Sequence, residues 1–237
     1  MKYMGSKARI AKEILPIILK NRKDGEWFVD MFCGGCNLLD KVEGKRIAND
    51  KNKYLIALYQ GLQNNVEKPM EISKELFSKA RDQFNNRCDY GFTDFELGWI
   101  GFMGGFNGRF FGGGYSGIHG DRNYPDEQIR NTLKSFEKLK DVKFFSRDYS
   151  EFQFKEKCTI YCDPPYFGTK EYDTKDKFNH DLFWKWVRKT TLEGHDVFVS
   201  EYNAPSDFKC IWEKEVKVSI RPNKTLNQTE KLFIFET

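Results

Sequence analysis

The segment CTIYCDPPY at residues 158–166 constrains the fold more than any other stretch of this 237-residue chain. Its first five residues carry no charge and suit a buried strand, and two consecutive prolines end that strand because they have no backbone N–H to donate. The prolines also hold the backbone extended and leave carbonyl oxygens free to accept hydrogen bonds. The segment therefore predicts a central strand that ends abruptly in polar groups, where ligands bind in open α/β sheets.

Other segments follow the same strand-and-turn pattern. Residues 27–32 form an apolar run closed by Gly34 and Gly35, and residues 46–50 end in the acid Asp50. Further strand-like runs lie at 142–149 and 196–202, and a hairpin is predicted from residues 214–220 and 231–237. Alternation of such runs with helical stretches predicts an α/β fold with a Rossmann-like, mostly parallel sheet.

Apolar spacing predicts the helices between these strands. An opening helix, with Ser6 as its N-cap, is indicated by Ile10, Ile14, Ile17 and Ile18, and others are expected from Asn37 and from Asp50. A later helix over 179–194 ends at Gly194, which suits a C′ position. Its buried face is predicted to consist of Leu182, Phe183, Trp186 and Val187.

The strand–helix alternation fades between residues 64 and 140, so we predict a core of residues 1–63 and 141–237 with residues 64–140 inserted. Ten of the nineteen glycines lie between Gly98 and Gly120, together with several aromatic residues. Such a density of glycine predicts loops and turns with exposed aromatic side chains, although aromatic residues anchored in the core are the alternative.

Charge and cysteine content narrow the class of protein. The net charge of +4 does not by itself indicate a nucleic-acid partner, although residues 1–25 alone sum to +5. The longest uncharged run, residues 54–66, is shorter than a membrane span, so we expect no membrane association and a cytoplasmic location. The six cysteines are expected to be reduced, and the C-x-x-C of Cys33 and Cys36 lacks a matching pair, so no metal is predicted.

Two groups of residues suggest a ligand site. Asp163, Pro164, Pro165 and Tyr166 combine a carboxylate, a rigid carbonyl and an aromatic ring at a strand end. Asp30 and Asp50 end two neighbouring strands beside the glycine turn, and an acid in the position of Asp50 accepts from ribose in nucleotide-type sites. A strand-ending turn with a buried tyrosine, and a turn-forming Asp30, are the plain structural alternatives. NAD is disfavoured because G-x-G-x-x-G is missing.

These motifs together carry a family resemblance over almost the whole chain. KYMGSK at 2–7, FVDMFCGG at 28–35, AND at 48–50, RDY at 147–149 and DPPY at 163–166 resemble, in this order, the D12 class of Dam-like N6-adenine DNA methyltransferases. FGGGYSG at 111–117 and SEYNAP at 200–205 resemble the phage-type members. Cys36 departs from the pattern because the family usually has a second glycine there.

The resemblance implies S-adenosylmethionine as cofactor, double-stranded DNA as partner without an obligate protein partner, and residues 64–140 as a target-recognition region. Lys7, Tyr3 and the Gly5-Ser6 turn would lie against the methionine part of the cofactor, with Asp30 near its amino group, Asp50 on the ribose and Asp148 on the adenine. Phe32, Gly34, Gly35 and Asp163 would complete the cofactor site. Asp163 to Tyr166 would hold the target base, and Arg109 and Arg122 are the candidate DNA contacts.

The residue types suit methylation of an amine independently of the family. Asp163 and the Pro164 carbonyl could each accept one hydrogen of an exocyclic amine, which directs the nitrogen lone pair at a methyl donor. Methylation of cytosine C5 needs a thiolate, typically from Pro-Cys, and the chain contains no Pro-Cys. N4-cytosine or RNA amine methylation would suit the same motif, and a catalytically silent DNA-binding relative is a third hypothesis.

Overall fold

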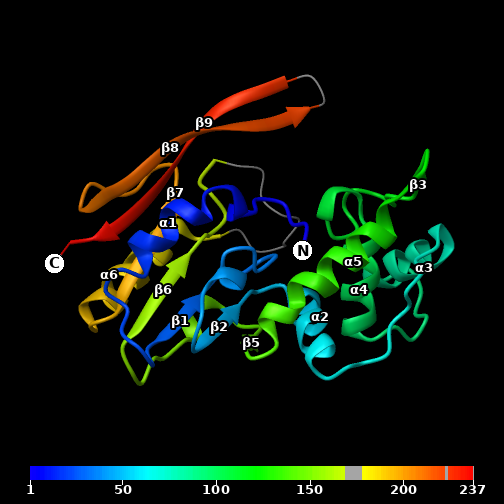
Figure 1. Ribbon diagram of the computed structural model, residues 1–237, viewed down its shortest axis with the longest axis horizontal. Helices are drawn as coiled ribbons and strands as arrows, with labels where there is room; N and C mark the ends of the chain where they lie inside the picture. The colour runs from blue at the N-terminus through cyan, green and yellow to red at the C-terminus, as the bar shows by residue number, and fades with distance from the viewer. Residues whose placement is uncertain (169–177, 222–223, 237) are drawn as a thin grey trace.

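Seven strands form a single sheet in the order β5-β2-β1-β6-β7-β9-β8 in the computed structural model of the protein (Figure 1). The structure describes residues 1–168, 178–221 and 224–236, with the side chains of 217–226 left aside. β5, β2, β1, β6 and β7 run parallel, and β9 joins β7 antiparallel. The predicted α/β, Rossmann-like sheet is confirmed. Its strands are β1 (Trp27–Asp30), β2 (Arg46–Asn49), β5 (Lys143–Phe145), β6 (Cys158–Cys162), β7 (Asp196–Glu201), β8 (Phe208–Arg221) and β9 (Lys224–Phe235).

Alternate residues of the central strands bury against different helices. Phe28 and Tyr161 belong to the cluster that contains α1 (Ala11–Ile18) and α2 (Lys53–Gln63). Val29 and Ile160 instead belong to the cluster that contains α6 (His180–Leu192). Because side chains alternate across a strand, this division places helices on both faces of the sheet and explains why β6 is buried along its whole length.

Two predicted helices begin later than expected. Ser6 caps the short 3₁₀ helix η1 (Lys7–Arg9) by accepting from the Ala8 N–H at 3.3 Å, and α1 starts only at Ala11. α2 starts at Lys53 rather than at Asp50, because Asn52 is the residue whose side chain accepts from the first free N–H groups. The Asp50 carboxylate is thereby left at the sheet edge.

Two other helix predictions are corrected. The segment from Asn37 forms only the 3₁₀ turn η2 (Leu39–Lys41), after which Val42 is extended. In α6, Leu182 is exposed, contrary to the prediction, and the neighbouring Trp184 packs on the Phe208 ring, with 4.6 Å between centroids. The predicted helix end is confirmed, since Gly194 has φ +96°.

The chain segment that connects α2 to β5 forms three further helices, which lie beside the sheet (Figure 1). The elements of this segment are α3 (Lys74–Phe84), α4 (Asp94–Gly104), η3 (Phe106–Gly108), β3 (Ile118–His119), β4 (Arg122–Asn123), α5 (Tyr124–Phe136) and η4 (Glu137–Leu139), and η5 (Tyr149–Glu151) follows β5. Most of the buried apolar residues of α3, α4 and α5 belong to the cluster that also contains α1 and residues of the sheet. The boundaries of the inserted region, 64–140, stay a prediction.

The prediction of loops from Gly98 onward is wrong for residues 98–104, which lie in the buried helix α4. A Cβ on Gly98 would lie 2.1 Å from the Tyr54 carbonyl oxygen of α2, so this glycine allows close packing of two helices. Trp99 and Phe102 are fully buried, whereas the predicted turns are present from Gly105 onward. In the described parts of the chain, no helix combines the length and apolar character that a bilayer span requires.

Candidate active site

The carboxyl ends of the parallel strands gather the predicted acids at one edge of the sheet. Asp30 ends β1 and is in register with Tyr161 of β6, two residues before Asp163. Asp50 follows β2 and Asp148 follows β5, the next strands outward. The charges of Asp163 and Asp50 both act on Asp30, so these three carboxyl groups form one electrostatic cluster.

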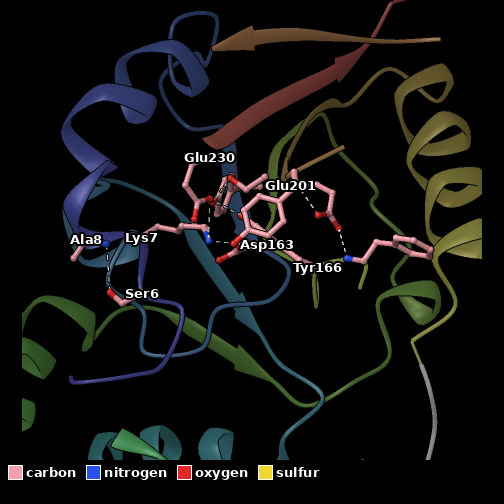
Figure 2. A network of polar contacts seen from close by, with 11 residues as sticks. Ser6, Lys7, Ala8, Asp163, Tyr166, Glu201 and Glu230 are labelled. Carbon is pink, nitrogen blue, oxygen red and sulfur yellow. Dashed lines mark hydrogen bonds and ion pairs between the residues drawn. The ribbon is translucent and has the colours of Figure 1, made fainter. Parts of the chain in front are cut away.

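Lys7 connects this edge with the C-terminal hairpin. Its ammonium lies 3.1 Å from Asp163 Oδ1 and 3.4 Å from Glu230 Oε2, and Figure 2 shows it between the two carboxylates. The Tyr166 hydroxyl donates to the same Glu230 oxygen at 2.8 Å, and the ammonium lies 4.5 Å from the centroid of the Tyr166 ring. Residues from η1, from the segment after β6 and from β9 therefore form one half-buried polar network.

Burial and charge shift the pKa values within this network. Burial raises the pKa of Asp163. The Lys7 charge opposes this shift but does not cancel it, so the pKa stays above its usual value. Burial alone would lower the pKa of Lys7, but the charges of Asp163 and Glu230 outweigh it and raise that pKa. Burial raises the pKa of Tyr166 well above its usual value, and the charges of Asp163 and Glu230 raise it further. The phenol therefore stays protonated and acts as a donor.

Glu201, at the end of β7, holds the backbone that follows the DPPY segment. Its two oxygens accept from the N–H of Phe167 at 3.0 Å and of Tyr202 at 2.7 Å. Burial raises the pKa of Glu201 to about 7, although both accepted hydrogen bonds oppose the shift. The Tyr202 ring meets that of Tyr166 edge to face, with 4.5 Å between centroids, so Glu201 fixes both segments that carry these rings.

The glycine turn after β1 is built by close contacts. A Cβ on Gly34 would lie 2.7 Å from the Tyr3 ring, and one on Gly35 would lie 2.6 Å from the Tyr3 Cβ, so larger residues would displace Tyr3. Asp50 accepts from the Gly34 N–H at 3.0 Å and from the Asn52 N–H at 2.9 Å. Asp50 therefore holds the turn in place, and its predicted contact with a ribose stays a prediction.

Cys36 has φ +53°, the left-handed backbone region that favours glycine. This conformation explains why a glycine would suit the position at which Cys36 departs from the family pattern. Cys33 and Cys36 are buried free thiols packed in the core. Within the described ranges, no cluster of three or more His, Cys, Asp or Glu residues could hold a metal ion.

Asp30 is a buried acid at the sheet edge with one oxygen that the described residues leave without a hydrogen bond. Its side chain is only 3% exposed, and among the described residues its Oδ1 has no hydrogen-bond partner. Burial, and then the charges of Asp163 and Asp50, raise the pKa of Asp30 well above its usual value. A cationic group bound at this edge would satisfy the oxygen and offset the clustered negative charge.

Phe32 and Asp148 both lie next to Tyr149. The Phe32 and Tyr149 rings are 5.8 Å apart, and Asp148 directly precedes Tyr149. Hydrogen bonds from Ser150 and the nearby Lys51 charge keep the pKa of Asp148 below its usual value, although burial opposes them. An apolar surface beside an ionised acceptor can hold a planar, amine-bearing ring, and the roles predicted for these residues stay predictions.

Arg109 and Arg122 lie in the segment between α2 and β5. Arg109 is exposed after η3, and Arg122 of β4 forms an exposed ion pair with Glu127 at 2.7 Å. Gly108, next to Arg109, packs on the backbone of the N-terminal segment, where a Cβ would lie 2.5 Å from the Lys2 carbonyl oxygen. Among the described residues, neither arginine forms an ion pair with the network around Lys7.

Sequence reasoning missed Glu201 and Glu230. Glu201 could have been found by the rule that identified the other acids, because it also ends a parallel strand. Glu230 lies within the antiparallel strand β9, and its position along that strand does not indicate that it belongs to the site. The structure brings it there because the next residue, Lys231, pairs with Glu201 at the end of β7.

A parallel α/β sheet with a glycine turn and strand-end acids at its carboxyl edge is the arrangement in which nucleotide-type ligands bind, and the DPPY segment lies at the same edge. The model of the D12 class N6 adenine-specific DNA methyltransferase family matches residues 3–208. The chain therefore belongs to the D12 class N6 adenine-specific DNA methyltransferase family, which confirms the resemblance seen in the sequence.

The chain is also similar to individual proteins. It is 27% identical over 194 residues to the modification methylase StsI of Streptococcus sanguinis. This alignment covers 71% of the chain but only 28% of StsI, so the chain spans about a quarter of that relative. A solved structure, SMU.472, described as a candidate methyltransferase complexed with SAH, is 13% identical, with a TM-score of 0.39, over 98% of this chain and 54% of that one.

Proposed function

We propose that the protein transfers a methyl group from S-adenosylmethionine to the N6 amine of an adenine that is flipped out of double-stranded DNA. The family assignment supports this proposal, and the observation that carries it is the placement of Asp163 and Tyr166 beside the acidic edge formed by Asp30 and Asp50.

S-adenosylmethionine supplies a methyl group on a positively charged sulfur and also carries an ammonium. Asp30, with its unsatisfied oxygen, would receive the ammonium, and Asp50, Asp148 and Phe32 would hold the nucleoside part. Tyr3 and the glycine turn would shape the floor of the site. The residues present fit such a cation because burial, and then the charges of Asp163 and Asp50, raise the pKa of Asp30, and a bound cation would offset both effects.

Asp163 and the Pro164 carbonyl would each accept one hydrogen of the adenine amine. The amine lone pair, otherwise delocalised into the ring, would then point at the methyl group, and an N–C bond forms as the S–C bond breaks. The electron pair of the S–C bond stays on the sulfur, and the nitrogen gives up one proton, which Asp163 as its hydrogen-bond acceptor would take and pass to water. No covalent enzyme intermediate is needed. Tyr166 would stack on the base, which must leave the duplex at a cost of about a few kcal/mol.

Incubation of unmethylated DNA with isotopically labelled S-adenosylmethionine, followed by mass analysis of the nucleosides, tests the proposal directly. Label in N6-methyladenine is the expected result. Label in N4-methylcytosine or in RNA would replace the proposed acceptor, and absence of label would favour a DNA-binding relative without activity. Methylation-sensitive sequencing of DNA from cells that express the protein would then identify the recognition sequence.

Binding of S-adenosylmethionine should release a proton if Asp30 receives its ammonium. The free protein holds Asp30 with a raised pKa, and a neighbouring cation lowers that pKa, so a proton leaves as the cofactor binds in the pH range between the two values. Calorimetric titrations in two buffers with different ionisation enthalpies measure the number of protons released. We expect Asp30→Asn to release fewer, and equal proton release by parent and variant would contradict this role of Asp30.

Arg109 and Arg122 are proposed to contact DNA. If either side chain binds a phosphate, its replacement by alanine should weaken binding to all sequences alike and reduce the salt slope by about one unit. If it binds a base edge, the replacement should instead relax discrimination at one position. Lys189→Ala, in α6, is the matched control. Variants that stay folded and bind every duplex like the parent would place the DNA surface elsewhere, with the basic N-terminal segment as the next candidate.

A further inference from the structure

Glu230 is a half-buried carboxylate outside every motif that the family resemblance supplied. Its side chain is 12% exposed, and it reaches back from β9 to Lys7 at 3.4 Å and to the Tyr166 hydroxyl at 2.8 Å. Lys7 is itself 10% exposed and is shared between Glu230 and Asp163 (Figure 2). One ammonium therefore has two carboxylate partners, only one of which belongs to the DPPY segment.

In this arrangement, Lys7 uses the groups that the proposed reaction assigns to the target base. Its ammonium lies 3.1 Å from Oδ1 of Asp163, the carboxylate to which the adenine amine would donate, and 4.5 Å from the centroid of the Tyr166 ring, on which the base would stack. An adenine amine bonded to Asp163 would therefore compete with Lys7 for that carboxylate. A buried ammonium left without a charged partner is strongly unfavourable.

We propose that Lys7 is a placeholder for the target amine and that Glu230 is a positioning residue, which keeps the ammonium paired when Asp163 turns to the adenine. This inference rests on the proposed function. Glu230 suits the role because it is already within ion-pair distance of Lys7. It is also anchored by the Tyr166 hydroxyl, so the carboxylate that receives the ammonium is held next to the stacking ring.

Glu230→Gln separates the charge of Glu230 from its shape. The amide oxygen can still accept from the Tyr166 hydroxyl, but the ammonium is left with Asp163 as its charged partner in this network. We expect the single-turnover rate of methyl transfer to fall about tenfold because Asp163 is then harder to free. Glu215→Gln, an exposed charge removal in β8 of the same hairpin, should transfer methyl at the parental rate.

A second readout excludes a merely structural effect. Fluorescence of 2-aminopurine, placed at the target position, reports departure of the base from the stack, and this base has no amine at position 6 to compete with Lys7. Glu230→Gln should therefore keep the parental 2-aminopurine signal while methyl transfer slows. Loss of both signals together would show that Glu230 only shapes the pocket, and would overturn the inference.

A double-mutant cycle tests whether Glu230 acts through Lys7. If it does, Glu230→Gln causes no further loss in a Lys7→Gln background, whereas independent roles give losses that multiply. Multiplying losses, or a parental rate in Glu230→Gln, would overturn the inference alone. A parent protein that methylates no adenine in the nucleoside assay would instead overturn the proposed function and the inference with it.

Discussion

Asp163→Asn should lower the turnover number for methyl transfer by about a hundred- to a thousandfold, the usual effect of removing one preorganised polar group from a transition state. The substitution keeps the size of the side chain but replaces one of its acceptor oxygens by a donor, which opposes an amine that must itself donate. Lys7 keeps Glu230 as a partner at 3.4 Å, so the network retains part of its charge pairing. Affinity for S-adenosylmethionine should change far less than turnover.

Rapid-quench measurement of methyl transfer and calorimetric titration of the cofactor separate these two effects. Asp24→Asn is a suitable control, because Asp24 is exposed and precedes β1 at the amino end of the sheet. Near-parental turnover in Asp163→Asn would reject the amine-activation mechanism. A loss confined to cofactor affinity would instead assign Asp163 to the cofactor.

Trp99→Ala should destabilise the protein by about 3–5 kcal/mol, as is usual for removal of a buried tryptophan. Trp99 is fully buried in α4, and its indole N–H donates to the Pro69 carbonyl at 2.8 Å, so the substitution leaves a cavity and an unpaired carbonyl group. For a chain of this size, we expect the melting temperature to fall by roughly 10 °C.

Thermal unfolding followed by circular dichroism measures this change. Phe106→Ala removes an aromatic side chain that is 51% exposed in the same segment, and it should leave the melting temperature close to the parental value. Equal melting temperatures for Trp99→Ala and the parent would mean that residues 98–104 do not form a buried helix. Loops, as the glycine content of this stretch suggests, would then be the better description.

The sheet could be predicted from the sequence because its signals are local. An apolar run ended by Pro164 and Pro165 can hardly continue as a strand, and the glycines after β1 force a turn that a larger residue could not make beside Tyr3. Asp30, Asp50 and Asp163 follow from the same reasoning, since the carboxyl ends of parallel strands share an edge. Local chemistry was therefore sufficient to find most of the candidate site.

What the sequence did not predict depends on contacts between distant segments. Gly98 lies in a helix because its missing side chain lets α4 approach the Tyr54 carbonyl, a contact between distant positions of the chain that composition cannot indicate. Glu230 joins the site only because β9 inserts antiparallel beside β7, which brings it to the DPPY segment. In both cases, the structural role of the residue depends on a contact with a distant segment of the chain.

The separation in sequence of Lys7, Asp163 and Glu230 has a consequence for biosynthesis. The network needs β9, the last strand of the described chain, so a ribosome that has completed the DPPY segment has not yet made the complete site. A nascent chain that carries the motifs but lacks residue 230 would lack one carboxylate partner of Lys7. The network would thus be fully assembled only after the hairpin of β8 and β9 has left the exit tunnel and closed on the sheet.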